Sequence, residues 1–255
     1  LKGSITPELL KLLNIKFCIL KRETDFQKLK KIIDHSKKNS QPVACLIEKN
    51  ILKNLNKNKS IRRQFGNLMR NDVINILLKK INKKTKLVAT TGFTSRELHQ
   101  IRSNKKIKNG QDFYMVGGMG HSSSVSLGIS LRTTKDVICL DGDGSFLMHL
   151  GSLVSIGKVG GQNFKHILFN NLSHESVGGQ TTNIEKLDIK KLIFSAGYKN
   201  FFKINKKDQL NLTLSKFLKS KGPSFLEIKI KPGSINNLKR PRNLIEIKKK
   251  FMKNF

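Results

Sequence analysis

The chain has 255 residues, of which 37% are hydrophobic and 26% charged, and its formal net charge is +33. This composition is typical of a globular protein and excludes a disordered chain. No apolar run reaches the roughly 18 residues of a membrane span, so we expect no transmembrane helix. The three cysteines, Cys18, Cys45 and Cys139, lie in apolar runs. An odd number of cysteines in such surroundings favours reduced thiols in a cytoplasmic protein over a disulfide framework.

The net charge by itself would indicate a nucleic-acid-binding protein. However, 41 of the 50 basic residues are Lys, and they occur beside 23 Asn and 26 Ile. These three residue types share A/T-rich codons, so genome composition explains their abundance together. The segment from Gly110 to Glu185 has four basic and six acidic residues, and Trp is absent from the chain. We therefore expect no specific nucleic-acid partner, and a basic nucleic-acid-binding protein is kept only as an alternative of another class.

Short apolar runs alternate with amphipathic stretches along the chain, which is the pattern of a parallel α/β sheet. The predicted strands are Ile15–Leu20, Val43–Glu48, Lys86–Thr90, Val137–Asp141, Lys165–Asn170, Asn200–Ile204 and Ser224–Ile230. The predicted helices are Thr6–Leu13, Asp25–His35, Arg70–Lys80, Ser95–Ser103, Ser122–Arg132, Ser145–Lys158, Lys186–Ser195 and Lys207–Ser220. The sequence therefore predicts the α/β class.

The predicted domains are separated by residues 51–59, which are polar, rich in Lys and Asn, and without periodicity. Such a segment is typical of a linker between domains. A short α/β segment over residues 1–50 precedes it, and the larger α/β domain covers residues 60–232. Residues 233–255 are expected to form a carboxyl-terminal tail, with little helix or strand pattern before Leu244.

The segment DGDGS, residues 141–145, lies between a predicted strand and a predicted helix. Its glycines allow a sharp turn, and the start of the helix offers free N–H groups to a phosphate. Asp143 would supply an anionic oxygen to a hard divalent cation. An ordinary Asp-Gly turn with Ser145 as helix cap is the alternative. Leu147 stands where a dinucleotide-binding fingerprint has its third glycine, and no Gly-Lys-Ser/Thr of a P-loop follows.

Asn170 and Asn171 end the next predicted strand, 25 residues after the GDG turn. That gap has room for one helix and one strand, so both turns are expected at the same edge of a parallel sheet. One carboxylate, one Asn oxygen and one backbone carbonyl, completed by phosphate oxygens, form a usual octahedral Mg²⁺ site. A lone Asn-Asn pair is common in turns, whereas the two turns at this spacing are far more specific.

The GDG turn followed by the Asn pair resembles the cofactor motif of thiamine-diphosphate-dependent decarboxylases. The segments VGGMGHSSSVSLGIS, VICLDGDGSFLMHLGSLVSIG and FNNLSHESVGGQTTN are similar to phosphonopyruvate decarboxylases and to the related sulfopyruvate decarboxylases. The resemblance extends from Lys86 to the carboxyl terminus and includes TTGFTSREL and KPGSINNLKRP. It implies a thiamine-diphosphate-binding fold with helices on both faces of the sheet. Residues 1–50 resemble the closing part of that family's preceding pyrimidine-binding domain.

The resemblance implies thiamine diphosphate and Mg²⁺ as cofactors. The implied metal ligands are Asp143, the Asn171 side chain and the carbonyl of Ser173. The implied cofactor-binding residues all lie in turns that follow strands: Thr91, Gly92, Gly117, Met119, Gly144 and Ser145. Met119 would place an apolar side chain between the two rings of the cofactor, and a gap-filling core residue is the alternative.

The implied reaction is decarboxylation of a 2-oxo acid with an anionic head group, with phosphonopyruvate as the favoured substrate and phosphonoacetaldehyde and CO₂ as products. The alternative is a sulfopyruvate decarboxylase or its thiamine-binding subunit. In this family a Glu of the pyrimidine-binding domain activates the cofactor, and that Glu is expected in a segment missing from the amino end. A second chain, or the missing domain, would complete the site, and a homo-oligomer is expected.

Three polar residues directly follow cofactor turns and are the candidates for head-group binding and proton transfer: His121, His174 and Glu175. His is the usual proton-transfer group near neutral pH, and a local cap is the alternative for each His. His149, one turn into the helix after Asp143, is expected to pack in the core rather than line the pocket.

Overall fold

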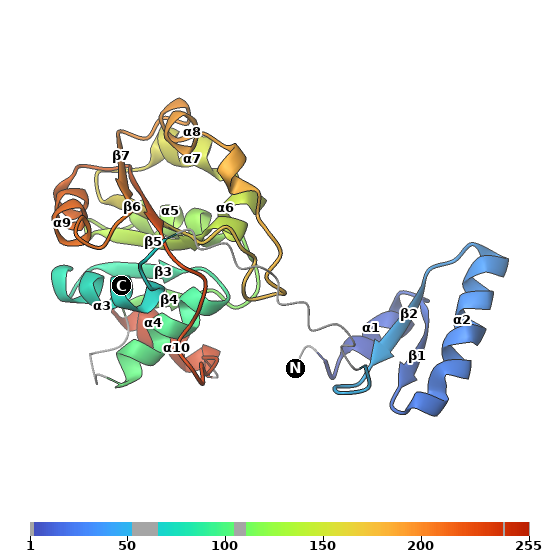
Figure 1. Ribbon diagram of the computed structural model, residues 1–255. Helices are drawn as coiled ribbons and strands as arrows, with labels where there is room; N and C mark the ends of the chain where they lie inside the picture. Colours follow the sequence, from blue (N-terminus) through green and yellow to red (C-terminus); the bar gives the residue numbers. More distant parts are fainter. Residues whose placement is uncertain (1–2, 53–65, 105–110, 242, 255) are drawn as a thin grey trace. The chain divides into compact units, whose positions relative to one another are not determined.

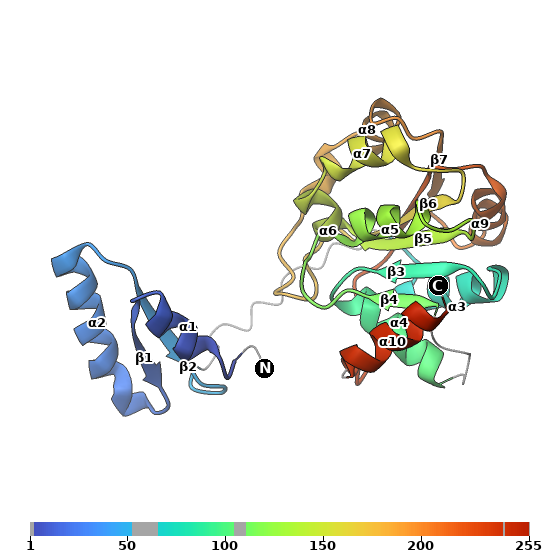
Figure 2. The ribbon, with the colours of Figure 1, turned by 180° about the vertical axis from the view of Figure 1, so that it is seen from behind.

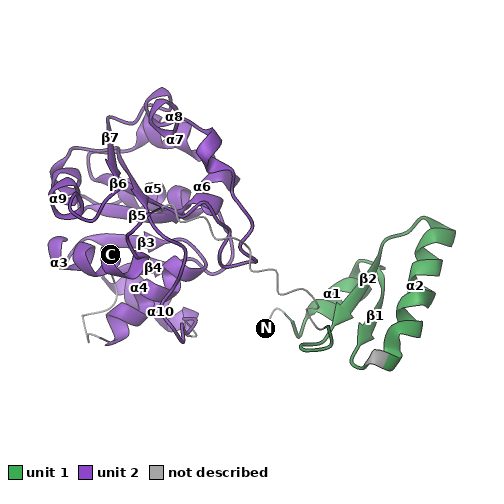
Figure 3. Ribbon diagram, in the orientation of Figure 1, with its two compact units in different colours: residues 1–59 green, residues 60–255 purple. Residues whose placement is uncertain are grey.

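A computed structural model describes residues 3–52, 66–104, 111–241 and 243–254. The chain divides into two compact units, residues 1–59 and residues 60–255, which Figure 3 distinguishes by colour. Most of the predicted linker, residues 53–59, lies outside the described residues.

The first unit is a β-α-β arrangement preceded by a helix. Strands β1 (Lys16–Leu20) and β2 (Val43–Ile47) pair in parallel, and Cys18 lies opposite Cys45 in the register. Helix α1 (Thr6–Leu12) precedes β1, and α2 (Phe26–Asn39), which follows the short 3₁₀ helix η1 (Glu23–Asp25), connects the two strands. The crossover is required because parallel strands cannot be joined by a tight hairpin.

The second unit contains a six-stranded sheet with the order β4-β3-β5-β6-β8-β7 (Figure 1). Every pair of neighbouring strands is parallel. The middle strands consist largely of buried apolar residues, as expected where both faces of a sheet are covered. The strands are β3 (Lys86–Ala89), β4 (Asp112–Tyr114), β5 (Val137–Gly142), β6 (Phe164–Asn170), β7 (Asn200–Ile204) and β8 (Ser224–Lys229).

Helices cover both faces of this sheet, as the views of Figures 1 and 2 show and as the sequence predicts. One face packs against α3 (Arg70–Lys80), α4 (Phe93–Asn104) and α9 (Leu210–Lys219). The other face packs against α5 (Ser122–Ser130), α6 (Asp143–Met148), α7 (Ser152–Val159) and α8 (Ile189–Ser195), with the 3₁₀ helix η2 (Ile184–Lys186) before α8. None of the described helices has the length and apolar character needed to cross a bilayer.

The chain reverses its winding direction beside β3. This strand lies between β4 and β5, so the chain first moves outward to β4 and then crosses back over β3 to form β5. The loop after β3 leads to α4 on one face of the sheet, whereas the loop after β5 leads to α6 on the other face. Such a switch point opens a crevice at the carboxyl ends of the strands, which is where open α/β sheets bind ligands.

Two features of the second unit differ from the sequence-based expectations. The predicted helix Ser145–Lys158 is two helices, α6 and α7, because the backbone of His149 leaves the helical region with φ −138° and ψ 51°. Strand β4 was not predicted, since it has three residues and lies at the edge of the sheet, where the apolar run is short.

The carboxyl-terminal helix α10 (Leu244–Lys253) packs against β4. Its Phe251 is buried and lies edge-on to the Phe113 ring with centroids 5.6 Å apart. Lys86 at the start of β3 is fully buried, and its ammonium group lies 5.5 Å from the centre of the Phe251 ring and donates to the backbone carbonyl of Asn254. The end of the chain therefore shares the packing of the second unit.

Candidate active site

A pocket lies at the carboxyl edge of the sheet, where the loops after β3, β4, β5 and β6 meet. Nine of the twelve residues predicted from the sequence line it: Thr91, Met119, Asp143, Gly144, Ser145, Asn171, Ser173, His174 and Glu175. The other three, Gly92, Gly117 and His121, belong to the same loops but do not line the pocket.

Asp143 is the first residue of α6, and its side chain is buried. Its Oδ1 atom accepts a hydrogen bond from the backbone N–H of Gly144 at 3.0 Å. Its Oδ2 atom accepts from the backbone N–H of Ser173 and from the Thr182 hydroxyl, both at 3.0 Å. Burial raises the pKa of the Asp143 carboxyl to about 6, and these hydrogen bonds act in the opposite direction. A buried carboxylate without a charged donor among these partners is well suited to a cation.

Asn171 and Ser173 lie beside this carboxylate because the chain turns sharply between them. Leu172 has a positive φ of 60°, which is unusual for a residue with a branched side chain. The turn lets the Ser173 N–H donate to the Asn171 Oδ1 atom at 3.1 Å as well as to Asp143. The three predicted metal ligands are therefore brought together, although they come from the loops after two different strands.

Ser145 joins the loops that follow β3, β4 and β5. Its hydroxyl oxygen accepts from the Thr90 hydroxyl at 2.8 Å and from the backbone N–H of Gly120 at 3.0 Å. All three residues are buried. Because these bonds use the acceptor capacity of the Ser145 oxygen, its proton remains directed to another acceptor, which suits a group that binds an anion.

The glycines of two loops have backbone conformations that other residues rarely adopt. Gly117, Gly118 and Gly120 have φ values of 77°, 56° and 91°, so the turn around Met119 requires glycine at these positions. Gly92, after β3, has a φ of 98°, and a Cβ atom there would lie 2.9 Å from the Ser176 hydroxyl. These glycines allow the backbone to pass close to the pocket.

His174 and His121 occupy different positions. The imidazole of His174 lies directly against Gly144, where an added Cβ atom would overlap its ring. His121 is exposed and its ring lies 4.1 Å from that of His149, measured between centroids. His149 is itself exposed, so the expectation that it packs in the core was wrong. The reason is the break between α6 and α7, which turns His149 out of the helix and next to His121.

Glu175 lies in a network of ion pairs and hydrogen bonds around Arg70. The sequence analysis did not predict Arg70 as a site residue. Its Oε2 atom accepts from Arg70 Nη2 at 3.1 Å and from Asn171 Nδ2 at 3.0 Å. Arg70, the first residue of α3, also lies 3.6 Å from Glu97 in α4 and lines the pocket. Burial raises the pKa of the Glu97 carboxyl, and the Arg70 charge opposes that rise. The one feature of the sequence that could have pointed to Arg70 is the scarcity of Arg, since nine of the 50 basic residues are Arg.

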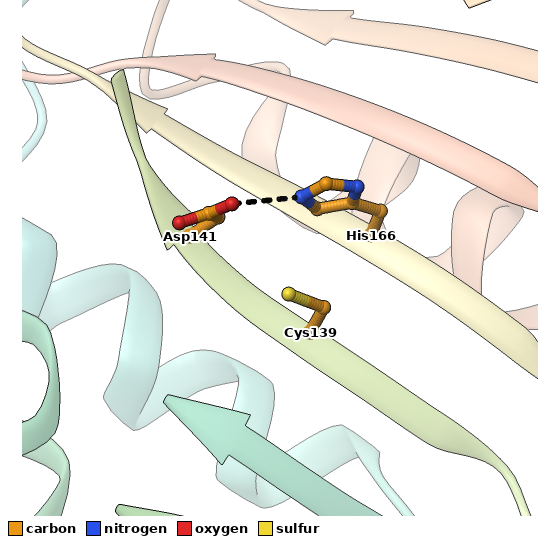
Figure 4. Close-up of side chains that lie close together, drawn as sticks. All are labelled: Cys139, Asp141 and His166. Carbon is orange, nitrogen blue, oxygen red and sulfur yellow. Dashed lines mark hydrogen bonds and ion pairs between the residues drawn. The ribbon is translucent and has the colours of Figure 1, made fainter. Parts of the chain in front are cut away.

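Behind the pocket, β5 and β6 place three potential metal ligands in the core. Figure 4 shows Cys139 and Asp141 of β5 beside His166 of β6, and their ligand atoms lie within 4.8 Å of one another. Both ring nitrogens of His166 have partners, namely Asp141 Oδ2 at 3.3 Å and the Tyr198 hydroxyl at 3.1 Å. Asp141 Oδ1 also accepts from the N–H of Gly142 at 3.0 Å. This buried chain of hydrogen bonds runs from Tyr198 through His166 and Asp141 to the N–H of Gly142, and it therefore fixes the start of the GDG turn.

Comparison with known families identifies this arrangement. A family model described as "Thiamine pyrophosphate enzyme, C-terminal TPP binding domain" matches residues 90–228, which is more than half of the chain and includes all four loops of the pocket. The chain belongs to the thiamine pyrophosphate enzymes. Its sheet with helices on both faces agrees with that family's cofactor-binding domain, and the resemblance found from the GDG turn and the Asn pair is confirmed.

Similar proteins within this family are decarboxylases. The chain is 37% identical to phosphonopyruvate decarboxylase of Streptomyces viridochromogenes over 166 residues, which is 65% of this chain and 41% of that protein. It is 32% identical to sulfopyruvate decarboxylase of Methanosarcina acetivorans, over 72% of this chain and 46% of that protein. It is 33% identical to sulfopyruvate decarboxylase subunit beta of Methanococcus maripaludis, over 72% of this chain and 96% of that subunit. The chain thus spans about two fifths of the length of the phosphonopyruvate decarboxylases that it matches.

Proposed function

We propose that this chain is the thiamine-diphosphate-binding part of a decarboxylase that acts on a 2-oxo acid with an anionic head group. The observation that carries the proposal is that Asp143, Asn171 and Ser173 lie together beside the GDG turn. The Asp143 Oδ2 and Asn171 Oδ1 atoms lie 3.0 and 3.1 Å from the same backbone nitrogen, that of Ser173. The similarity to two kinds of decarboxylase supports the reaction type.

The residues of the pocket fit a magnesium ion with a diphosphate. The buried Asp143 carboxylate, the Asn171 amide oxygen and the Ser173 carbonyl are the hard oxygen ligands that Mg²⁺ prefers. Gly144 allows the His174 ring to lie directly against the start of α6, where any side chain would meet that ring. Gly144, Ser145, Thr91 and Gly92 would hold the diphosphate, and Gly117 and Met119 would hold the thiamine rings.

When bound, thiamine diphosphate supplies the electron sink that decarboxylation of a 2-oxo acid requires. The chain's own residues bind, orient and exchange protons around it. His174 lines the pocket and is placed to hold or donate a proton near the substrate head group. His121, which is exposed and lies beside His149, would contact a group that enters from outside.

We favour phosphonopyruvate as the substrate. Phosphonate can hold two negative charges near neutral pH and can accept a proton, whereas sulfonate holds one charge and cannot. Imidazole donors such as His174 therefore match phosphonate better, because they can exchange a proton with it. The sulfopyruvate reaction is the alternative.

A second chain, or a further domain, is proposed to complete the site. One relative that the chain covers almost completely is named as a beta subunit. By analogy, the group that activates the cofactor would be supplied by that partner, and the assembled enzyme would be an oligomer.

The experiment is a measurement of CO₂ release by the full protein, purified with any partner chain that it retains, in the presence of thiamine diphosphate and Mg²⁺. Phosphonopyruvate, sulfopyruvate and pyruvate are compared as substrates. We expect phosphonopyruvate to be preferred over sulfopyruvate by roughly 10- to 100-fold in kcat/KM, which is the size expected from one lost charge-assisted contact. Equal rates with pyruvate would refute the anion pocket, and no release from any 2-oxo acid would refute the decarboxylase.

A further inference from the structure

We propose that Glu175 and Arg70 are positioning residues that determine which atom of the Asn171 amide faces Asp143. The inference rests on the proposed function, because it concerns the metal site of that function. It also gives Glu175 a different role from the proton transfer that the sequence suggested.

The Glu175 carboxylate selects the amino end of the Asn171 side chain. An ionised carboxylate only accepts hydrogen bonds, whereas an Asn amide has a donor end and an acceptor end of nearly the same shape. Glu175 Oε2 lies 3.0 Å from Asn171 Nδ2, so the amide NH₂ is directed to Glu175. The Asn171 Oδ1 atom must then face the opposite way, where it accepts from the N–H of Ser173 at 3.1 Å. That N–H also donates to Asp143, so the amide oxygen is on the carboxylate side of the pocket.

Arg70 holds the Glu175 carboxylate in this position. Its Nη2 atom donates to the same Oε2 atom at 3.1 Å, and only 5% of the Arg70 side chain and 10% of the Glu175 side chain are exposed. The backbone N–H of Gly233, after β8, donates to the other oxygen of Glu175. With these three donors the carboxylate is firmly held between α3 and the loop after β8, and it has little capacity left for proton transfer to a substrate.

Without this carboxylate, only the Ser173 N–H, which it shares with Asp143, would distinguish the two orientations of the Asn171 amide. A larger share of the molecules would then present NH₂ rather than oxygen toward Asp143, and an NH₂ group cannot coordinate a cation. The contacts of Glu175 thus prepare Asn171 as an oxygen ligand before any metal binds.

The test is a double-mutant cycle in the full protein, purified with any partner chain that it retains. Glu175→Ala removes the acceptor of the Asn171 NH₂ group, whereas Asn171→Asp makes both ends of that side chain oxygen, so that its orientation no longer matters. The probe is Mn²⁺ with thiamine diphosphate, and bound Mn²⁺ is counted by electron paramagnetic resonance. Glu227→Ala is the matched control, because Glu227 accepts from the neighbouring Asn170 at 2.9 Å.

We expect Glu175→Ala to weaken Mn²⁺ binding about tenfold when residue 171 is Asn, the size of one lost buried hydrogen bond, and not to weaken it in the Asn171→Asp background. Arg70→Met, which removes the donor that holds Glu175, should show the same dependence on residue 171, and this comparison remains valid if Glu175→Ala fails to fold. Glu227→Ala should bind as the wild type does. An equal loss from Glu175→Ala in both backgrounds would overturn the positioning role, whereas Mn²⁺ binding by the wild type would leave the proposed function standing. No cofactor-dependent Mn²⁺ binding by the wild type would instead overturn the proposed function, and this inference with it.

Discussion

The backbone N–H of Ser173 donates to Asp143 Oδ2 at 3.0 Å, although the two residues are 30 positions apart in the chain. This bond joins the loop after β6 to the start of α6, and it brings the two turns of the cofactor motif to one point. The bond depends on the order of the sheet, because β5 and β6 are neighbouring parallel strands whose carboxyl ends lie side by side. Disturbing either turn is therefore expected to affect both.

The first prediction concerns the charge of Asp143. Asp143→Asn removes the buried negative charge that is proposed to face the metal, so thiamine diphosphate should bind about 10- to 100-fold more weakly at saturating Mg²⁺. Calorimetric titration measures this directly. Asp136→Asn is the control, because Asp136 is half exposed, pairs with Lys165 and lies away from the pocket. Equal affinity in Asp143→Asn and wild type would remove the metal-binding role.

The second prediction concerns the space above Gly144. Gly144→Ala should abolish or strongly weaken cofactor binding, because the added Cβ atom would meet the His174 ring, with Cε1 only 2.6 Å away. Gly128→Ala is the matched control, since Gly128 lies in α5 and an added Cβ there meets no atom within 4 Å. Gly128→Ala should raise the free energy of unfolding by about 1 kcal/mol without changing the affinity for the cofactor. Similar cofactor affinities for the two Ala variants would contradict the proposed diphosphate position.

The third prediction separates the two histidines. His174 lines the pocket and His121 does not, so His174→Gln should lower kcat/KM for the favoured substrate about 100- to 10,000-fold, as loss of a general acid or base does. His121→Gln should lower it less, mainly through KM. Steady-state rates of CO₂ release by the assembled enzyme test this order. A larger loss in His121→Gln would place the reacting head group beside His121 rather than in the pocket.

Sequence patterns predicted the central part of the fold because central parallel strands consist of continuous apolar runs. Strands β5 and β6 were found within one residue of their observed bounds. Edge strand β4 was missed because its three residues carry no such run, and the break between α6 and α7 was missed because the apolar spacing continues across it. The spacing of apolar residues indicates which side chains are buried, but it does not indicate where a backbone turn interrupts a helix.

The candidate site was predicted where its residues lie in local motifs and missed where they act over long distances. The GDG turn and the Asn pair are short patterns with a chemical reason for each residue. Arg70 contacts Glu175 across 105 positions, and no spacing rule connects them. Among the arginines that the structure describes, Arg70 and Arg102 are buried in ion pairs, which indicates that a rare Arg in a Lys-rich chain is a candidate for a buried ion pair.

The fourth prediction tests the second of these arginines as a structural element. Arg102 donates to both carboxylate oxygens of Asp112, at 2.8 and 2.9 Å, and Asp112 is buried. Arg102→Met leaves that carboxylate without its cation, so the free energy of unfolding should fall by about 3–5 kcal/mol. Lys250→Met removes an exposed ion pair with Glu246 and should change it by less than about 1 kcal/mol. Urea denaturation compares the two, and equal effects would show that the Arg102 pair contributes little.

Equilibrium dialysis of thiamine diphosphate against the full protein, purified with any partner chain that it retains, tests the central claim most directly when Mg²⁺ is compared with a chelator in its place. The proposed coordination by Asp143, Asn171 and Ser173 predicts saturable binding of one cofactor per chain that is lost when Mg²⁺ is removed, because the diphosphate and the metal bind as a unit. Binding of equal strength with and without Mg²⁺, or no binding in either condition, would contradict it.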